Sequence, residues 1–310
     1  MTKLGLTDLD VFPLCLGANV FGWTADRDRS FAVLDAYAAA GGNFVDTADV
    51  YPAWVPGNSG GESETILGEW LAARGNRDSI VVATKGSRLA PNQGLSARAV
   101  HGAAEASLRR LGVDHIDLYY AHYDDPDTPV EETVAAYDEL VSAGKVRHVA
   151  ASNFTPARLS ASLAFAEREG LARYAVLQPH YNLVERGTFE GELAELAERW
   201  QLATVPYYGL ARGFLTGKYR EGVPVDSPRA QGAAKYLTET GLRVLAALEQ
   251  VARSRDTTMA AVALAWLLSR PTVAAPIASA RNPAQLAELL PMATLALSPA
   301  ELAALESASA

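Results

Sequence analysis

Short apolar runs recur along the chain and alternate with longer amphipathic stretches. Apolar residues occupy mostly consecutive positions within these runs, which is typical of parallel strands that are covered on both faces. We therefore predict strands at residues 14–16, 44–46, 80–84, 116–120, 146–151, 176–179, 203–206 and 273–277.

The stretches between these runs carry the periodicity and the end signals of helices. In LSARAVHGAAEASLRRLG, Ser96 can cap the start of a helix and Gly112 can end it after two arginines. Near the end of the chain, Ser298 and Glu301 have the spacing of a capping box. The first of these helices has one apolar face, formed by Val100, Ala104, Leu108 and Leu111.

Eight strands that alternate with helices predict a (β/α)8 TIM barrel. Ahead of the first strand, KLGLTDLDVF at residues 3–12 has the pattern of a short β-hairpin, which would close the floor of the barrel. The chain contains no linker, no low-complexity run and no repeat beyond the alternation of strands and helices. We therefore expect a single domain over residues 1–310.

Composition narrows the class of protein. The formal net charge of −9 argues against a nucleic-acid partner, because such proteins present basic surfaces. Cys15 is the one cysteine, so no internal disulfide can form. The N-terminal residues lack the apolar run of a signal peptide, and no run reaches the roughly 20 residues of a membrane span. We expect a cytoplasmic protein that does not bind membranes.

Polar side chains gather at the carboxyl ends of three predicted strands. Asp46 ends the second strand and Tyr51 follows it, while Lys85 and His122 lie at the ends of the third and fourth strands. The carboxyl ends of barrel strands form one face, which is where barrel enzymes carry their active sites. An acid, a phenol, an ammonium and an imidazole can together deliver a proton to a carbonyl oxygen.

Each of these four residues also has a purely structural interpretation. Lys85 and Asp46 could form an ordinary ion pair, Tyr51 could be a surface aromatic residue, and His122 could bond only to the backbone.

Two long loops are predicted over the same face. YPAWVPGNSGGESE begins at Tyr51, and a second segment covers residues 207–236. Asp49 and Asp124, which lie near these loops, are interpreted as solvated or loop-capping residues.

Three aromatic residues lie in loops near the four polar side chains. Trp23, Trp54 and Tyr123 either cover the rim of the barrel or form an apolar wall for an aromatic or sugar-like carbonyl compound. No charged residue is predicted to face a substrate carboxylate.

Seven motifs occur in order and together resemble the aldo-keto reductase family over nearly the whole chain. They are DTADVY, VVATKG, DLYYAHYDDPDTPVEET, GKVRHVAASNFTP, LQPHYNLVER, GLARGFLTGKY and PIASARNPAQLAE. The opening LGANVFGW also resembles the family's first-strand loop beside the nicotinamide. The resemblance implies a catalytic tetrad that consists of Asp46, Tyr51, Lys85 and His122.

Carbonyl reduction needs a hydride at carbon and a proton at oxygen, and the hydride must come from a cofactor. Tyr51 is the expected proton donor, although a free tyrosine has a pKa of about 10. A neighbouring Lys85 ammonium would lower that pKa, and Asp46 would hold the lysine in place. His122 would orient the carbonyl and share its developing charge.

The chain lacks a Gly-rich Rossmann fingerprint after its first strand, so the barrel loops must bind the cofactor. By resemblance, Tyr207 stacks under the nicotinamide. The carboxamide is assigned to Ser152, Asn153 and Gln178. The pyrophosphate is assigned to Leu210, Arg212, Gly213 and Lys218. Asn153 could instead be a turn residue, and Gln178 a buried amide.

The adenosine end of the cofactor is assigned to residues after the last strand. The Arg281 guanidinium, beside a helix start, suits the 2′-phosphate that distinguishes NADP from NAD, although it could also be a plain surface cation. By resemblance, the same site includes Ser279, Gln285 and Glu288. The sequence departs from the family at Ser279, where Gly is common, at Leu289, where Asn is common, and at 208–209, where Ser–Pro is frequent.

These observations predict an NADPH-dependent reductase of an aldehyde or ketone, with no residues assigned to a metal. One rival is a Schiff-base aldolase that uses Lys85. The other is an NADPH-binding regulatory or redox-sensing subunit that docks on a membrane protein, as some family members do. The sequence leaves the physiological substrate, the reaction direction and the oligomeric state open.

Overall fold

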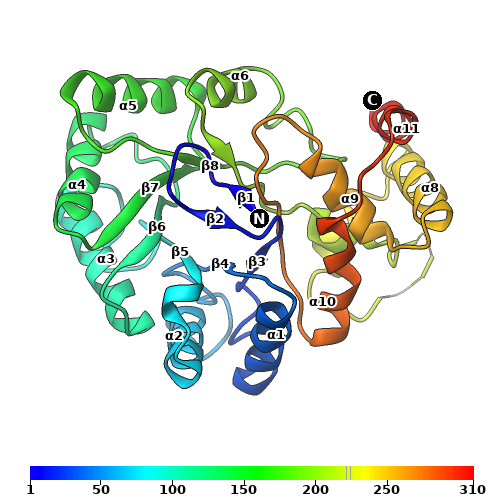
Figure 1. Ribbon diagram of the computed structural model, residues 1–310, viewed down its shortest axis with the longest axis horizontal. Helices are drawn as coiled ribbons and strands as arrows, with labels where there is room; N and C mark the ends of the chain where they lie inside the picture. Colours follow the sequence, from blue (N-terminus) through cyan, green and yellow to red (C-terminus); the bar gives the residue numbers. More distant parts are fainter. Residues whose placement is uncertain (221, 224) are drawn as a thin grey trace.

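A computed structural model describes residues 1–220, 222–223 and 225–310. In this part of the chain, eight parallel strands form one sheet in the order β10-β3-β4-β5-β6-β7-β8-β9. Figure 1 shows them curling around a common centre with helices outside. Their bounds are β3 Cys15–Gly17, β4 Phe44–Asp46, β5 Val81–Gly86, β6 Ile116–Ala121, β7 Val146–Ser152, β8 Val176–Gln178, β9 Ala203–Thr204 and β10 Ile277–Ala278.

Hydrogen bonds between β9 and the chain leading to β10 close the sheet into a barrel. The backbone N–H of Thr204 donates to Thr272 at 2.8 Å, that of Ala274 donates to Thr204 at 2.9 Å, and that of Ile277 donates to Pro206 at 2.8 Å. The predicted (β/α)8 architecture is therefore confirmed.

The last two strands are shorter than predicted. Residues 203–206 were expected as one strand, but β9 ends at Thr204. The expected strand at 273–277 is divided into an isolated bridge at Val273 and the strand β10, which begins at Ile277. Pro206 and Pro276 explain both differences, because a proline has no N–H to donate to a sheet.

Helices between the strands form a ring around the barrel, and α8 and α11 lie outside that ring (Figure 1). The helices are α1 Arg27–Ala39, α2 Glu62–Arg74, α3 Ala97–Leu111, α4 Val130–Ser142, α5 Pro156–Glu169, α6 Glu192–Arg199, α7 Ala230–Ala234, α8 Glu239–Ser254, α9 Met259–Leu268, α10 Pro283–Leu289 and α11 Pro299–Ala308. Short 3-10 helices lie at η1 Arg77–Ser79, η2 Ala211–Thr216 and η3 Leu290–Ala293.

The helix ends follow the sequence signals. The Ser96 side chain accepts from the Ala99 N–H at the start of α3, and Gly112 ends that helix with a φ of 64°. At α11 the Ser298 and Glu301 side chains form both bonds of the capping box. These local predictions are confirmed.

The N-terminal hairpin closes one end of the barrel. Its strands, β1 Thr2–Lys3 and β2 Asp10–Val11, pair in antiparallel fashion, and the hairpin lies in front of the barrel strands in Figure 1. Leu4, Leu9 and Val11 are buried in one apolar cluster with the inward-facing strand residues. The predicted hairpin and its place on the barrel floor are thus both observed.

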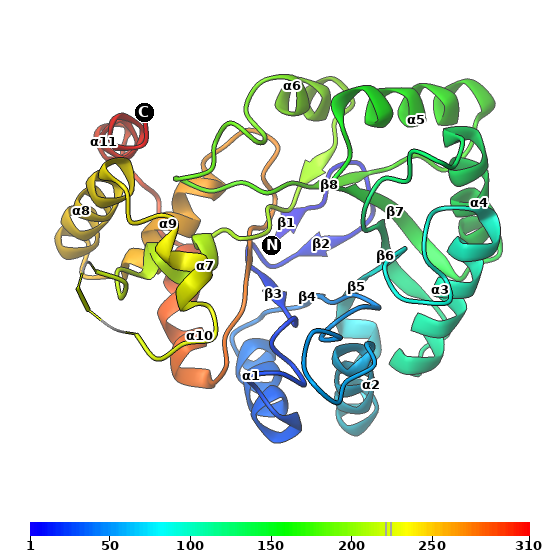
Figure 2. The ribbon, with the colours of Figure 1, turned by 180° about the vertical axis from the view of Figure 1, so that it is seen from behind.

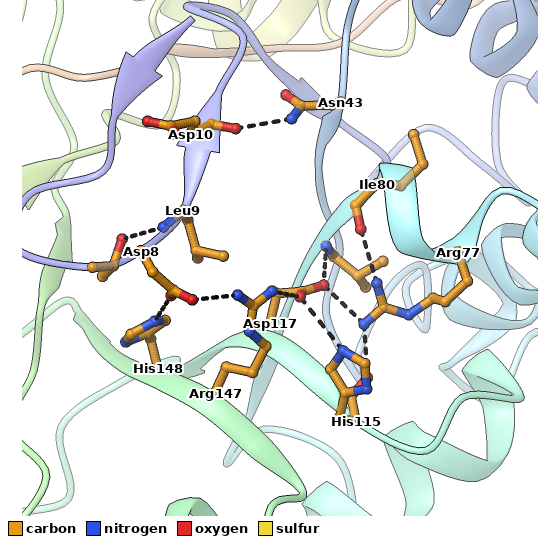
Figure 3. A network of polar contacts seen from close by, with 12 residues as sticks. Asp8, Leu9, Asp10, Asn43, Arg77, Ile80, His115, Asp117, Arg147 and His148 are labelled. Atoms are coloured by element: carbon orange, nitrogen blue, oxygen red, sulfur yellow. Dashed lines mark hydrogen bonds and ion pairs between the residues drawn. The ribbon is translucent and has the colours of Figure 1, made fainter.

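Charged residues at the same end tie the hairpin to the strands (Figure 3). Arg147 contacts Asp8 of the hairpin turn and Asp117 of β6, each at 2.7 Å. Asp117 also pairs with Arg77 at 2.8 Å, and Asp8 pairs with His148 at 2.6 Å. The opposite end of the barrel is free of this network and carries the long loops, as the view from behind shows (Figure 2).

Within the described residues, none of the helices combines the length and the apolar composition needed to cross a bilayer.

Candidate functional site

A cavity of about 1240 Å³ opens among the loops at the carboxyl ends of the strands. Lys85 is the one predicted site residue outside its lining, because it lies fully buried beneath the cavity. The other predicted residues all line the cavity: Trp23, Asp46, Tyr51, Trp54, His122, Tyr123, Ser152, Asn153, Gln178, Tyr207, Leu210, Arg212, Gly213, Lys218, Ser279, Arg281, Gln285 and Glu288.

Lys85 and Asp46 form a buried ion pair at the centre of this arrangement. Their strands β4 and β5 are neighbours, so the two side chains meet inside the barrel. The Lys85 ammonium donates to Asp46 Oδ1 at 2.5 Å and to the Thr47 carbonyl oxygen at 2.7 Å. Burial alone lowers the pKa of Lys85, but attraction to Asp46 and Tyr51 outweighs it, so the pKa is raised. Lys85 therefore carries a fixed positive charge.

Tyr51 lies on the loop between β4 and α2, and its position is set by that loop. The Tyr51 carbonyl oxygen accepts from Gly61 at 3.1 Å and Ser63 at 3.2 Å, at the start of α2. Its ring centroid is 5.0 Å from the Lys85 ammonium. Burial raises the pKa of the Tyr51 hydroxyl, while the charge of Lys85 opposes that shift. The lysine acts in the expected direction, but the expectation of a lowered net pKa is wrong because burial has the larger effect.

His122 follows β6 and faces Tyr51, with a distance of 5.9 Å between ring centroids. Burial, followed by the charges of Lys85 and Arg88, holds the pKa of His122 well below its usual value. The imidazole is therefore neutral near pH 7. Its Nδ1 atom is buried without a partner among the described residues, so Nε2 is the nitrogen available to the cavity.

The residues expected to hold the carboxamide form one connected polar network. Ser152 Oγ donates to the Gln178 carbonyl oxygen at 2.9 Å, and Gln178 Nε2 donates to Asp46 Oδ2 at 3.0 Å. Asn153 Nδ2 donates to the His122 carbonyl oxygen at 2.9 Å. Asn153 has a φ of 56°, which turns the chain at the end of β7. Asn153 is therefore a turn residue that also faces the cavity.

Tyr207 connects this network to the next loop. Its hydroxyl donates to Asn153 Oδ1 at 2.9 Å. Its ring stacks on His180, with centroids 5.2 Å apart and an interplanar angle of 18°. A flat aromatic surface thus borders the amide groups, as stacking of a planar ring would require.

Positive side chains line the cavity next to β9 and β10. Arg212, Lys218 and Arg281 lie there as predicted, and Arg229, which sequence reasoning missed, joins them. Within residues 1–220, 222–223 and 225–310, none of these four forms an ion pair with a carboxylate. A group of cations without carboxylate partners suits a ligand that carries several phosphates.

The backbone near these cations is irregular. Arg212 and Gly213 have φ values of 59° and 91°, which interrupt η2. Both φ values lie in the left-handed region, so the chain turns here and does not continue as a regular helix. Gly213 suits this position because glycine adopts a positive φ without strain.

The residues assigned to adenosine are partly occupied by contacts within the protein. Gln285 Oε1 accepts from the Arg281 N–H at 3.0 Å. Ser279 Oγ donates to Asn19 Oδ1 at 2.7 Å, and Arg229 donates to the same atom at 3.4 Å. Asn19 therefore links three parts of the chain and is a second residue that sequence reasoning missed.

Three aromatic rings form the wall of the cavity near the tetrad. Trp54 meets Tyr51 and Trp23 edge-on, with centroid distances of 5.7 and 5.6 Å. Tyr123 lies 5.2 Å from His122. Arg88 also lines the cavity, and its guanidinium carbon lies 4.4 Å from the Tyr123 ring centroid. Arg88 is thus a charged residue in the cavity wall that sequence reasoning did not single out.

Of the two interpretations given for Asp49 and Asp124, solvated or loop-capping, the structure supports the second for both. Asp49 is only 1% exposed, so it is not solvated. Its Oδ2 accepts from the Leu89 N–H at 3.3 Å, which joins two loops of the site. Burial, together with the buried carboxylate of Glu64, raises the pKa of Asp49 to about 7. Asp124 does act as a loop-capping residue, because its Oδ1 accepts from the Asp125 N–H at 2.9 Å. The carboxylate also pairs with the Arg158 Nε–H at 3.0 Å.

Comparisons with known proteins find similar sequences over nearly the whole chain. The model of the "Aldo/keto reductase family" matches residues 13–310. A norsolorinic acid reductase of Emericella nidulans is 34% identical, over 91% of this chain and 74% of its own. The uncharacterized oxidoreductase YrpG of Bacillus subtilis is 34% identical over 96% and 91%. A probable voltage-gated potassium channel subunit beta of Oryza sativa subsp. japonica is 33% identical over 92% and 88%.

Proposed function

The chain belongs to the aldo/keto reductase family, and on that premise we propose that it reduces an aldehyde or ketone to an alcohol with NADPH. The observation that carries this proposal is the buried ion pair between Lys85 and Asp46 beneath a tyrosine and a neutral histidine that face one cavity. The family supports a nicotinamide-dependent oxidoreductase of carbonyl compounds.

Each residue of the tetrad has a separate task in this proposal. Tyr51 donates the proton to the carbonyl oxygen, since its raised pKa keeps the hydroxyl protonated near neutral pH. Lys85 stabilises the phenolate that remains, and Asp46 holds the ammonium in place. His122, being neutral, donates a hydrogen bond from Nε2 to the same oxygen and orients it.

The amides, the aromatic ring and the cations of the cavity fit a nicotinamide dinucleotide. Ser152, Asn153 and Gln178 would hold the carboxamide, and Tyr207 would lie against the ring. Phosphates would meet the cations near β9 and β10, which have no carboxylate partner among the described residues. The bound cofactor supplies the hydride that the carbonyl carbon accepts.

We assign the preference for NADPH over NADH to Arg281. A charge-assisted hydrogen bond to the 2′-phosphate contributes about 1.5–3 kcal/mol, so Arg281→Ala should weaken NADPH binding by roughly tenfold or more and leave NADH binding nearly unchanged. Titration of both cofactors against wild type and variant by fluorescence measures this. An equal loss for both cofactors would move the preference to another cation, such as Lys218 or Arg229.

Tyr51→Phe tests the proposed reaction directly. Loss of a general acid typically costs about 10²–10⁴-fold in rate, whereas the affinity for NADPH should stay close to that of wild type. Absorbance of NADPH with a panel of aldehydes and ketones measures turnover. Wild-type turnover in the variant would exclude Tyr51 as the proton donor.

Two rival functions are separable by experiment. Similarity to probable voltage-gated potassium channel beta subunits is consistent with a regulatory subunit as the alternative. If that subunit bound NADPH for regulation alone, the protein would bind NADPH but reduce none of the panel at a useful rate. A Schiff-base aldolase would form a borohydride-trapped adduct on Lys85. The raised pKa of Lys85 and its bonds to Asp46 and Thr47 weigh against that chemistry, because a Schiff base needs a neutral amine.

A further inference from the structure

Arg88 is a cation of the cavity to which the proposed reaction gives no task. It follows β5 in the loop that leads to α3, three residues after Lys85. The Arg88 side chain is exposed, lines the cavity and lies with its guanidinium over the ring of Tyr123. Tyr123 is the neighbour of His122 in the chain, so the guanidinium is close to the reacting groups.

The loop that carries Arg88 is fixed on several sides. The Leu89 N–H donates to Asp49, and the Gly94 N–H donates to the Ser87 carbonyl oxygen at 3.1 Å. Gln93 Nε2 donates to the Arg88 carbonyl oxygen at 3.2 Å. A guanidinium on an anchored loop loses less conformational entropy when it binds a ligand than one on a free loop.

No carboxylate within the described residues forms an ion pair with the Arg88 guanidinium. Its charge acts instead on His122, which lies under the same part of the cavity. An arginine that stacks on a tyrosine and has no acidic partner presents its N–H groups to whatever enters the cavity.

Arg88 is also distant from the cations assigned to the cofactor. In the barrel order, β5 lies four strands from β9, on the opposite side. Arg212, Lys218 and Arg229 follow β9, and Arg229 experiences the charges of Arg281 and Arg212. Phosphates bound among those residues would leave Arg88 unpaired.

We propose that Arg88 selects substrates by binding a carboxylate carried on an aromatic aldehyde or ketone. The aromatic ring would lie against Trp54 and Tyr123, with its carbonyl oxygen at Tyr51 and His122. The ring centroids of His122 and Tyr123 lie 5.2 Å apart, and the Arg88 guanidinium carbon lies 4.4 Å from the Tyr123 centroid. His122 and Arg88 thus flank the same tyrosine ring, which suits a substrate whose carboxylate and carbonyl lie on opposite sides of one aromatic ring. This inference rests on the proposed function and names the class of substrate for the same site.

The test compares 4-carboxybenzaldehyde with its methyl ester, because the two share the ring and the position of the aldehyde but differ in charge. The ester withdraws more electron density from the ring, so each compound is compared between wild type and variant. Wild type should show a lower KM for the acid, and added salt should reduce that difference. Arg88→Met replaces the guanidinium by an unbranched apolar side chain. It should raise KM for the acid about tenfold, with kcat nearly unchanged. KM for the ester should change by less than about twofold.

Two further variants are matched controls. Arg88→Lys should retain part of the preference for the acid, because it keeps the charge but loses the planar donors. Arg98→Met removes an exposed arginine on α3, outside the cavity lining, and should change neither KM. Equal losses for acid and ester in Arg88→Met, or no preference in wild type, would overturn the inference.

Binding is measured as well as turnover, so that the two proposals can fail separately. Quenching of the fluorescence of Trp23 and Trp54, with NADP⁺ present to prevent reduction, gives the affinity for each aldehyde. A chain that binds the acid in preference but reduces neither compound would support Arg88 and overturn the reductase. A chain that binds and reduces both equally would overturn only the role of Arg88.

Discussion

At the scale of single residues, the charge on Lys85 affects two groups at once. It opposes the effect of burial on the pKa of Tyr51 and contributes to the low pKa of His122. One buried ammonium thus keeps the tyrosine a stronger acid than burial alone would allow and keeps the histidine neutral. The short contact with Asp46 makes this arrangement rigid.

Replacement of Lys85 by Met should change the pH profile as well as the rate. Without the positive charge, the pKa of Tyr51 rises further. The alkaline fall of the reduction rate should therefore move to higher pH, as should the rise of the oxidation rate. We expect kcat at pH 7 to fall about 10²-fold or more. A lower kcat with an unchanged pH profile would mean that Lys85 supports only the packing of the site.

Asp49 is a buried carboxylate whose ionisation is unfavourable in the folded protein. Its Oδ1 atom has no partner among the described residues, and Glu64 lies close by with Arg110 paired to it at 2.6 Å. The pKa of Asp49 rises from 3.8 to about 7, so the folded state binds a proton more tightly than the unfolded state. Its contribution to stability is therefore greatest below pH 4 and is lost as the pH rises through about 7.

Asp49→Asn should consequently stabilise the protein at alkaline pH. At pH 8 the variant avoids the buried charge, and we expect a gain on the order of 1–3 kcal/mol in the free energy of unfolding. At pH 5 the gain should be smaller. Urea unfolding at both pH values measures this, with the exposed Asp28→Asn as the control of equal charge. If the variant and wild type differed in the free energy of unfolding by the same amount at pH 5 and pH 8, the raised pKa of Asp49 would be contradicted.

At the scale of elements, helix α2 connects the site to the outer ring. Its start holds the Tyr51 loop through Gly61 and Ser63, and its middle packs against the end of α3. A Cβ atom on Gly68 would lie 2.4 Å from the Leu111 carbonyl oxygen and 2.6 Å from the carbonyl carbon. These are backbone atoms, so they cannot give way without moving the end of α3.

Gly68→Ala should therefore destabilise the protein although alanine favours helices. Overpacking of this kind costs roughly 1–3 kcal/mol, which urea unfolding measures. Gly187→Ala is the matched control, because a Cβ atom there meets no atom within 4 Å. Equal stability of the two variants would show that the helices can separate without cost.

At the scale of the whole molecule, the barrel divides stability and chemistry between its two ends. The hairpin and its ion pairs close one end (Figure 3), and the loops of the cavity occupy the other. Asp117 is the centre of the closed end, since it binds Arg77, Arg147 and the Val82 N–H at 2.8, 2.7 and 2.9 Å.

Asp117→Asn should lower stability without changing the reaction. The substitution leaves Arg77 without a carboxylate partner and Arg147 with only Asp8. Breaking a buried ion pair of this kind costs roughly 3 kcal/mol. Asp8→Asn, whose side chain is 67% exposed, should cost less than about 1 kcal/mol. Thermal unfolding measures both, and kcat should equal that of wild type below the transition. A change in kcat would show that the two ends are coupled.

The sequence by itself predicted the barrel, because its signals are local. Apolar runs at 80–84 and 116–120 mark strands, and Ser96 and Gly112 mark the ends of a helix within a few residues of one another. The candidate tetrad followed from the same pattern, since strand ends of a parallel barrel meet on one face. The chemical roles of Asp46, Tyr51 and the other site residues stay predictions.

Only the tertiary structure decided how these groups affect one another. The pKa of Asp49 depends on its burial and on the charge of Glu64, and the pKa of His122 depends in part on Arg88, which lies on another loop. Arg88 and Arg229 belong to loops with no periodic pattern, so no local signal aims them at the cavity. Burial and charge act through space, and the folding of distant segments determines which side chains share a low-dielectric environment.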